Sequence, residues 1–215
     1  MRVPIFCCLI FFNLIQYINV CAQSNFNNIV GEYYLSGVME TASGFQLNAD
    51  SSFQFFFSYG ALDRYASGKW HLKDNKVVFV SREKPVSDFK IISEKTSDQS
   101  NITIKITDKN EFLTQYVSCA LYSDGKRSEM KAGEKGTLQF PQQAFDSIAL
   151  VFEFCPEKIS FIKPSQRNHN YFEFGFEPWI LEVFFNNFSI PIVENGLKGA
   201  HPFLDPEKEV VDAER

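Results

Sequence analysis

Large apolar side chains alternate with polar ones through residues 53–72, and this pattern predicts two β-strands that pair with each other. The first strand has aromatic residues at every second position, and the second has small residues, one tryptophan and one leucine there. The residues on these two faces are Phe53, Phe55, Phe57 and Tyr59, followed by Ala66, Gly68, Trp70 and Leu72. Alternation with a period of two is the pattern of a strand with one buried face. A glycine opposite a bulky ring lets that ring lie over the backbone, so we expect both strands to share a core.

The connection from Tyr59 to Arg64 is expected to be a loop longer than a two-residue turn. It contains an adjacent acid and base, Asp63 and Arg64. Loops on a rigid scaffold often carry binding residues, so Tyr59, Asp63 and Arg64, with the nearby Trp70, are candidate contacts for a ligand or a partner. The alternative is that Asp63 only shapes the turn, since aspartate is a common turn residue, and that Arg64 stacks on a tyrosine.

Further short strand patterns surround this pair, and they predict an all-β fold with two domains. Residues 23–92 contain five strand patterns separated by turns, which indicate an antiparallel meander or partial barrel. Residues 93–100 are polar and are expected to be a linker. Residues 101–200 contain seven or more short strand patterns, typical of a β-sandwich. The charged residues 201–215 are expected to form a C-terminal tail.

Residues 29–81 resemble lipocalin-like domains of secreted bacterial proteins. The matching residues are Gly31-x-Tyr33, Leu47, Asp50, Phe53, Gly68-x-Trp70 and Asn75-x-Val77. The block Tyr59-Gly-Ala-Leu-Asp-Arg64 with Gly68-x-Trp70 also resembles a motif of exported bacterial proteins. The resemblance implies a barrel that holds a small apolar ligand, although a full lipocalin barrel has eight strands and five are predicted here. The later region resembles immunoglobulin-like or transthyretin-like sandwiches, and Ile102–Asp108 resembles the opening strand of carboxypeptidase-regulatory-like domains.

Residues 1–22 have the pattern of a secretory signal peptide. Arg2 precedes an apolar run from Val3 to Ile15, and Val20-Cys21-Ala22 suits cleavage after Ala22. The run is short for a membrane-spanning helix, so no transmembrane segment is predicted. We expect an exported protein that is periplasmic or extracellular. The alternative is a lipid anchor on Cys21.

Charge and motif content narrow the expected functions. The chain has 26 acidic and 21 basic residues and a net charge of −5, so it lacks the basic surface that nucleic acid requires. It contains neither a Gly-x-Ser-x-Gly elbow nor a His-Glu-x-x-His motif, and we predict no enzyme activity. Its histidines, His71, His169 and His201, have no metal-ligand spacing. We therefore predict neither a metal site nor a cofactor.

Two further groups of residues have more than one interpretation. Arg167, His169 and Tyr171 lie in a polar, aromatic-edged stretch that suits binding of a sugar or a peptide, and the alternative is a hydrophilic connection between strands. Cys119 and Cys155 remain after signal cleavage. An exported protein allows a disulfide between them, and the alternative is two buried thiols.

The sequence thus favours an exported, non-enzymatic binding or interaction protein with an unknown protein partner. The alternative function is a lipocalin-like carrier. In that case a small apolar ligand is expected to lie against Phe53, Phe55, Phe57 and Trp70.

Overall fold

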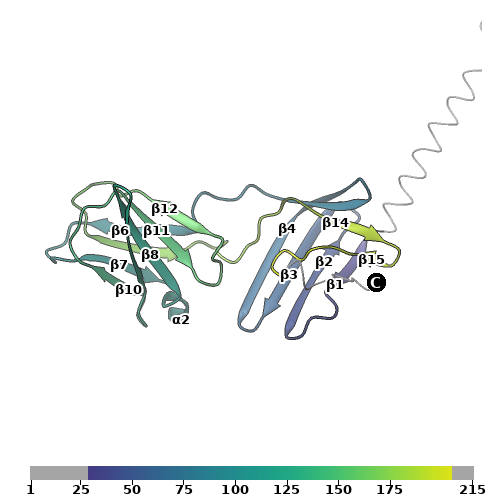
Figure 1. Ribbon diagram of the computed structural model, residues 1–215, viewed down its shortest axis with the longest axis horizontal. Helices are drawn as coiled ribbons and strands as arrows, with labels where there is room; N and C mark the ends of the chain where they lie inside the picture. The colour runs from purple at the N-terminus through teal and green to yellow at the C-terminus, as the bar shows by residue number, and fades with distance from the viewer. Residues whose placement is uncertain (1–28, 205–215) are drawn as a thin grey trace, which may run out of the picture. The chain divides into compact units, whose positions relative to one another are not determined.

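A computed structural model describes residues 29–204 of the chain (Figure 1). The predicted signal peptide, Cys21 and most of the predicted C-terminal tail lie outside these residues. The chain divides into two compact units. The first contains the described residues up to Glu83 and those from Val183 onward, and the second is Lys84–Glu182. Almost all elements in both are β-strands, which confirms the predicted all-β class.

The first unit is a seven-stranded antiparallel sheet with the order β1-β2-β3-β4-β5-β14-β15. Its strands are β1 (Gly31–Tyr34), β2 (Thr41–Leu47), β3 (Ser52–Tyr59), β4 (Leu62–Lys73), β5 (Lys76–Ser81), β14 (Asn186–Val193) and β15 (Gly196–Leu197). Tyr33 on one edge strand and Leu197 on the other belong to the same buried cluster. The sheet therefore curls around a common interior, as expected for a partial barrel.

The predicted pairing of β3 with β4 is confirmed, and one glycine explains how the aromatic face fits. Gly68 lies opposite Phe53. A Cβ atom on Gly68 would collide with the carbonyl oxygen of Val80 and would lie 2.8 Å from Cε1 of Phe53. The ring of Phe53 thus occupies the space that a side chain at position 68 would take.

The connection between β3 and β4 is shorter than predicted. β3 ends at Tyr59 and β4 begins at Leu62, so Gly60 and Ala61 alone join the strands. Gly60 has a φ of 58°, which glycine adopts without steric cost and which tight hairpin turns require. The predicted loop is therefore wrong, and Asp63 and Arg64 lie within β4.

The second unit is a sandwich of two four-stranded sheets, as predicted. One sheet has the order β10-β7-β13-β6 and the other β12-β11-β8-β9. The strands are β6 (Phe89–Lys95), β7 (Ile102–Thr107), β8 (Val117–Ser123), β9 (Lys126–Lys131), β10 (Thr137–Phe140), β11 (Ser147–Phe152), β12 (Ile159–Ile162) and β13 (Tyr171–Phe176), with a short helix α2 (Glu111–Thr114). Side chains from both sheets form one buried cluster between them.

The boundaries between the units differ from the predicted ones at three places. The predicted linker 93–100 begins inside β6, which pairs with β13. The segment 179–185 is not the predicted strand, and β14 pairs with β5 of the first unit. Residues 183–204 therefore belong to the first unit rather than to the sandwich. Strands that are neighbours in sequence are often not neighbours in a sheet, and the apolar pattern of β14 does not identify its partner.

Candidate functional site

Three exposed aromatic side chains lie in one line across the outer face of the first unit's sheet. In the strand register, Tyr34 is opposite Gly44, Gly44 is opposite Phe56, and Phe56 is opposite Tyr65. Tyr34, Phe56 and Tyr65 are 50%, 41% and 47% exposed, whereas Phe57, which faces the interior, is buried. We call Tyr34, Phe56 and Tyr65 the aromatic row.

Gly44 leaves room above its backbone for two rings of the aromatic row. A Cβ atom at this position would lie 2.9 Å from Cε1 of Phe56 and 3.1 Å from Cδ1 of Tyr34. The two ring centroids are 6.3 Å apart, although their strands are separated by β2 and adjacent strands are spaced about 4.8 Å. Both rings therefore lean toward each other over the backbone of Gly44.

Polar side chains flank the aromatic row on both sides. Gln46, Gln54 and Ser67 are opposite one another on β2, β3 and β4 and form one flank. Ser58 and Asp63 are on the other, where the hydroxyl of Ser58 donates to the carboxylate of Asp63. The apolar surface is thus a single line of rings between hydrogen-bonding groups.

The acid beside Tyr34 is already engaged within the chain. Oη of Tyr34 donates to Oε2 of Glu32 at 2.6 Å. This hydrogen bond and the negative charge of Glu32 raise the pKa of Tyr34. The phenol therefore stays protonated and keeps the Glu32 carboxylate at one end of the aromatic row.

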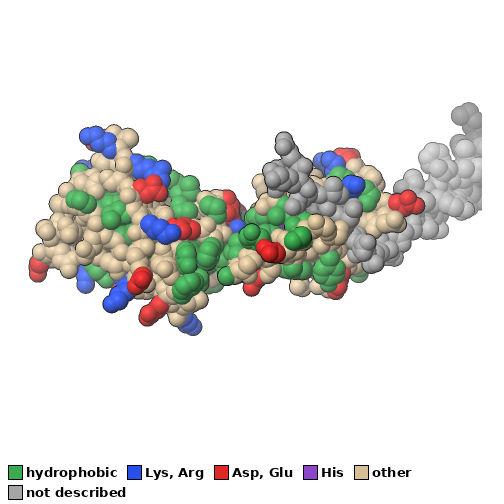
Figure 2. Space-filling view, turned by 60° about the horizontal axis from the view of Figure 1, so that its bottom comes forward, with side chains coloured by type: hydrophobic (Ala, Val, Ile, Leu, Met, Phe, Trp, Pro, Cys, Tyr) green, Lys and Arg blue, Asp and Glu red, His purple; other side chains and the backbone are tan. Residues whose placement is uncertain are grey.

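Exposed apolar side chains also occur elsewhere on both units (Figure 2). In the second unit, Ile159 and Phe161 are exposed on the four-residue edge strand β12. Phe112 is exposed in the short helix α2. Single exposed apolar residues are common on protein surfaces. The aromatic row differs from these because four strands align it and a glycine is needed to seat two of its rings.

The structure separates the first group of predicted site residues. Tyr59 is exposed at the end of β3, and Asp63 faces outward from β4. Arg64 faces the interior and is 3% exposed, with its guanidinium carbon 4.7 Å from the centre of the Phe203 ring. Trp70 is buried, and its Nε1 donates to the carbonyl of Asn48 at 3.1 Å. Adjacent residues of a strand face opposite sides, so Asp63 and Arg64 do not form one acid–base site.

A polar contact that the sequence did not predict holds the C-terminal segment against the inner face of the sheet. The backbone N–H of Phe203 donates to Nδ1 of His201 at 3.1 Å. Nε2 of His201 therefore carries the proton, and it lies 2.9 Å from Oγ of Ser43. Ser43 in turn donates to the carbonyl of Phe56 at 2.8 Å. Burial lowers the pKa of His201 to about 4, so the imidazole is neutral near pH 7.

The position of His201 corrects the prediction of a tail from residue 201 onward. His201 is buried, and its ring centroid lies 5.5 Å from that of Phe57. Phe203 contacts the same Phe57 ring at 5.1 Å. No spacing motif in the sequence indicated that this segment packs on residues more than 140 positions earlier.

The second group of predicted site residues is tied to β6. Nδ1 of His169 lies 3.0 Å from Oε1 of Glu94, and the same oxygen accepts from the N–H of Ser165 at 2.6 Å. Burial alone would raise the pKa of Glu94, but the nearby His169 ring and the hydrogen bond from the N–H of Ser165 outweigh it and lower that pKa. Nζ of Lys95 lies 4.8 Å from the centre of the Tyr171 ring. These contacts favour a structural connection between strands.

Arg167 is near His169 and Tyr171 in the sequence but lies in a different environment from both. Its side chain is exposed, while Tyr171 is the first residue of β13. Burial, followed by the charge of Glu173 and a hydrogen bond to it, raises the pKa of Tyr171. The three candidates of this stretch therefore occupy different environments.

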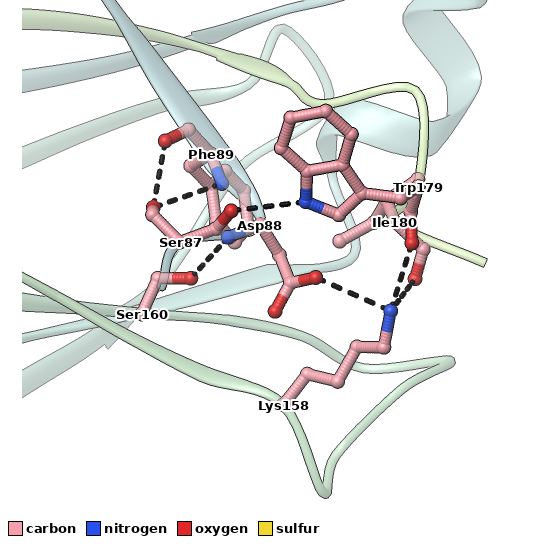
Figure 3. A network of polar contacts seen from close by, with 7 residues as sticks. All are labelled: Ser87, Asp88, Phe89, Lys158, Ser160, Trp179 and Ile180. Carbon is pink, nitrogen blue, oxygen red and sulfur yellow. Dashed lines mark hydrogen bonds and ion pairs between the residues drawn. The ribbon is translucent and has the colours of Figure 1, made fainter. Parts of the chain in front are cut away.

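Two buried charged side chains, Lys158 and Asp88, form a network in the second unit that the sequence did not indicate (Figure 3). Nζ of Lys158 lies 3.2 Å from Oδ1 of Asp88 and donates to the carbonyls of Trp179 and Ile180 at 2.8 and 2.9 Å. The backbone N–H of Asp88 donates to Oγ of Ser160 at 2.8 Å. Both ends of the ion pair are enclosed by protein, so its role is to hold the fold together.

Both cysteines of the described region are buried thiols in the structure. Cys119 lies on β8 and Cys155 follows β11, and both side chains belong to the sandwich core. Burial, with a smaller effect of the Glu129 charge, raises the pKa of Cys119 to about 12. A thiol with such a pKa is a poor nucleophile at neutral pH.

Among residues 29–204, no group of three or more His, Cys, Asp or Glu side chains is arranged to hold a metal ion. Within the same residues, none of the helices has the length and apolar character needed to cross a membrane.

Comparison with known proteins gave no relative from which to transfer a function. Neither a family model, nor a curated protein, nor a solved structure matches the chain.

Proposed function

We propose that the protein is an exported, non-enzymatic binding protein that contacts its partner through the aromatic row. The observation that carries this proposal is the alignment of Tyr34, Phe56 and Tyr65 on the outer face of four neighbouring strands. Large aromatic side chains are costly to expose to water. When several gather on a surface, they commonly mark an interaction site.

The polar networks favour binding over catalysis. His201 contacts Ser43 and the backbone of Phe203, and His169 contacts Glu94. Each of these contacts fixes one segment of the chain on another. The resemblance to exported lipocalin-like proteins and the signal-peptide pattern of residues 1–22 support the expected location outside the cytoplasm.

The alternative function, a carrier of a small apolar ligand, has less support from the interior. The Phe55 ring centroid lies 4.7 Å from that of Phe45, 5.3 Å from that of Phe185 and 6.3 Å from that of Phe203. The rings expected to line a ligand cup therefore pack on rings of the same chain. A ligand would have to displace some of them, which makes the outer surface the better candidate.

The proposal is tested by sedimenting the full chain with the cell-envelope fraction of the producing organism. We expect the wild type to sediment with the envelope and a Phe56→Ser/Tyr65→Ser variant to remain in the supernatant. Tyr59→Ser is the matched control, because Tyr59 is 55% exposed, more than Phe56 and Tyr65, but lies at the end of β3 on the face opposite to the aromatic row. Equal sedimentation of the wild type and the double variant, at matched melting temperatures, would refute the proposal.

A further inference from the structure

We infer that the aromatic row binds a neutral polysaccharide chain, with sugar rings stacked on Tyr34, Phe56 and Tyr65. This inference rests on the proposed function of the aromatic row as a contact surface. The first observation that supports it is the position of the rings on the sheet. Tyr34 and Phe56 lie over Gly44 and are each about half exposed. The planes of the two rings are inclined to each other by 60°, so each ring exposes a face at its own angle, and each such face can stack on the C–H face of one pyranose.

The width of the apolar surface argues against a protein partner. The aromatic row is one residue wide, since the next positions on either side carry Gln54 and Ser58. A stable protein interface covers about 800 Å² on each partner, with a buried centre that is more apolar than its rim. Three rings in a line do not provide such a centre, but they match the narrow footprint of an extended polymer.

The polar side chains beside the aromatic row can form hydrogen bonds with the hydroxyl groups at the edge of a sugar ring. Gln46, Gln54 and Ser67 are exposed beside the rings and supply both hydrogen-bond donors and acceptors. Sugar hydroxyls need both kinds of partner at the edge of the stacked ring. The amide and hydroxyl side chains of this flank can meet that need, and the Glu32 carboxylate, which is opposite Gln46, adds an acceptor at the end of the flank.

The charges near the aromatic row exclude an anionic polymer or an anionic membrane surface. Glu32 accepts from Tyr34, and Asp63 accepts from Ser58, so both nearby acids add negative charge. Lys69 lies one outward position beyond Ser67 on β4, and its Nζ donates to the carbonyl of Asp50 at 3.1 Å. Phosphate binding relies on clustered Lys and Arg side chains, which these positions do not offer. A neutral chain fits this surface best.

The shape of the aromatic row favours an extended chain. Its residues are aligned across β1 to β4 at right angles to the strands, because residues opposite one another in register lie on one line. A β-1,4-linked chain is nearly straight and can present successive ring faces along that line. An α-1,4-linked chain coils away from a straight surface and provides a natural comparison.

The test is calorimetric titration of the full chain with neutral hexasaccharides of β-1,4-glucan, β-1,4-mannan, β-1,3-glucan and α-1,4-glucan. We expect a β-1,4-linked hexasaccharide to bind more tightly than the α-1,4-glucan. Phe56→Ser and Tyr65→Ser should each weaken that binding at least tenfold, whereas Tyr59→Ser should leave it unchanged. Gln54→Ala should weaken it less than loss of a ring. Binding that persists in Phe56→Ser at a matched melting temperature would overturn the inference.

A second measurement separates the inference from the proposed function. Periodate cleaves the vicinal diols of sugars, and protease removes proteins, so the envelope fraction is treated with each before sedimentation. Binding that depends on the aromatic row and is lost after periodate supports a polysaccharide, even if no hexasaccharide of the panel binds. Binding that depends on the row, survives periodate and is lost after protease overturns the inference alone. Absence of row-dependent binding overturns both.

Discussion

Nζ of Lys158 lies 3.2 Å from Oδ1 of Asp88, and the two side chains are 3% and 2% exposed. Asp88 belongs to the segment that enters the second unit, and Trp179 and Ile180 belong to the segment that leaves it (Figure 3). Nζ donates to both of their carbonyls. Lys158 thus joins the first and last segments of the sandwich.

Lys158→Met should destabilise the second unit by about 3–5 kcal/mol, since it leaves the Asp88 carboxylate buried without its cation. Urea titration followed by hydrogen exchange of peptides from β7 and β13 measures this unit. Lys131→Met is the matched control, because its ion pair with Glu153 is 2.6 Å long but 56% and 31% exposed. Exposed pairs of this kind contribute about 1 kcal/mol or less.

The double variant Asp88→Leu/Lys158→Met tests the cause of the destabilisation. Replacing both charges removes the uncompensated carboxylate, so it should recover at least half of the stability lost in Lys158→Met. A double variant that is less stable than the single one would show that hydrogen bonding by Lys158 to the Trp179 and Ile180 carbonyls matters more than the charge of Asp88.

The strands were predictable where one face of the chain is buried. Phe53, Phe55 and Phe57 alternate with polar or exposed residues, and β3 has the predicted face in the core. The same alternation does not indicate with which other strand a given strand pairs. β14 pairs with β5 from more than 100 residues away, and its apolar residues would fit a sandwich edge equally well. This is why the end of the chain was assigned to the wrong unit.

The candidate site was less predictable than the fold. Tyr34, Phe56 and Tyr65 belong to three different strands, and only the strand register aligns them. Asp63 and Arg64 looked like a pair because they are adjacent, but adjacency in a strand places them on opposite faces. A correct prediction of the two-residue turn at Gly60 would have placed Asp63 and Arg64 in a strand and Phe56 opposite Tyr65, but it would not have placed Tyr34.

His201 should make the stability of the first unit depend on pH. Burial holds its pKa at about 4 in the folded chain, whereas an unfolded histidine has a pKa near 6.5. As the pH falls from 6.5 to 4, the unfolded state gains a proton that the folded state does not. The free energy of unfolding should therefore decrease through this window by on the order of 2 kcal/mol.

His201→Gln is the variant that isolates this effect, because glutamine keeps an N–H donor for Ser43 but does not titrate. The measurement is urea unfolding of the wild type and the variant between pH 4 and pH 7, followed by hydrogen exchange of β3 peptides. All other residues are the same in both proteins, so the difference between the two curves belongs to His201. Parallel curves would show that the buried imidazole is not the source of the pH dependence.

The two thiols of the sandwich core should be unreactive in the folded protein. Burial raises the pKa of Cys119 to about 12, and Cys155 is buried as well. The reference is the protein unfolded in about 6 M guanidinium chloride, which unfolds ordinary domains. Within the time that a thiol reagent at pH 8 needs to label both cysteines of the unfolded protein, it should label neither in the folded protein. Peptide mapping by mass spectrometry assigns the label to each cysteine. A peptide pair linked by a disulfide in the unreduced protein would contradict the structure.

Gly68→Ala should destabilise the first unit because the added methyl group has no space. It would collide with the Val80 carbonyl and lie 2.8 Å from both Cε1 of Phe53 and Cα of Ser81. Two of these three atoms belong to the backbone of β5, which cannot move without breaking its pairing with β4. Overpacking of this kind typically costs about 1–3 kcal/mol, and we expect the upper part of that range.

Gly133→Ala is the control for the loss of glycine itself. A Cβ atom there would have its nearest neighbour at 3.9 Å, the carbonyl oxygen of Thr137, so the change should alter stability by about 0.5 kcal/mol or less. Thermal unfolding of both variants gives the comparison. Equal melting temperatures for Gly68→Ala and Gly133→Ala would contradict the structure. They would mean that the ring of Phe53 or the β5 backbone lies farther from Gly68 than the structure shows.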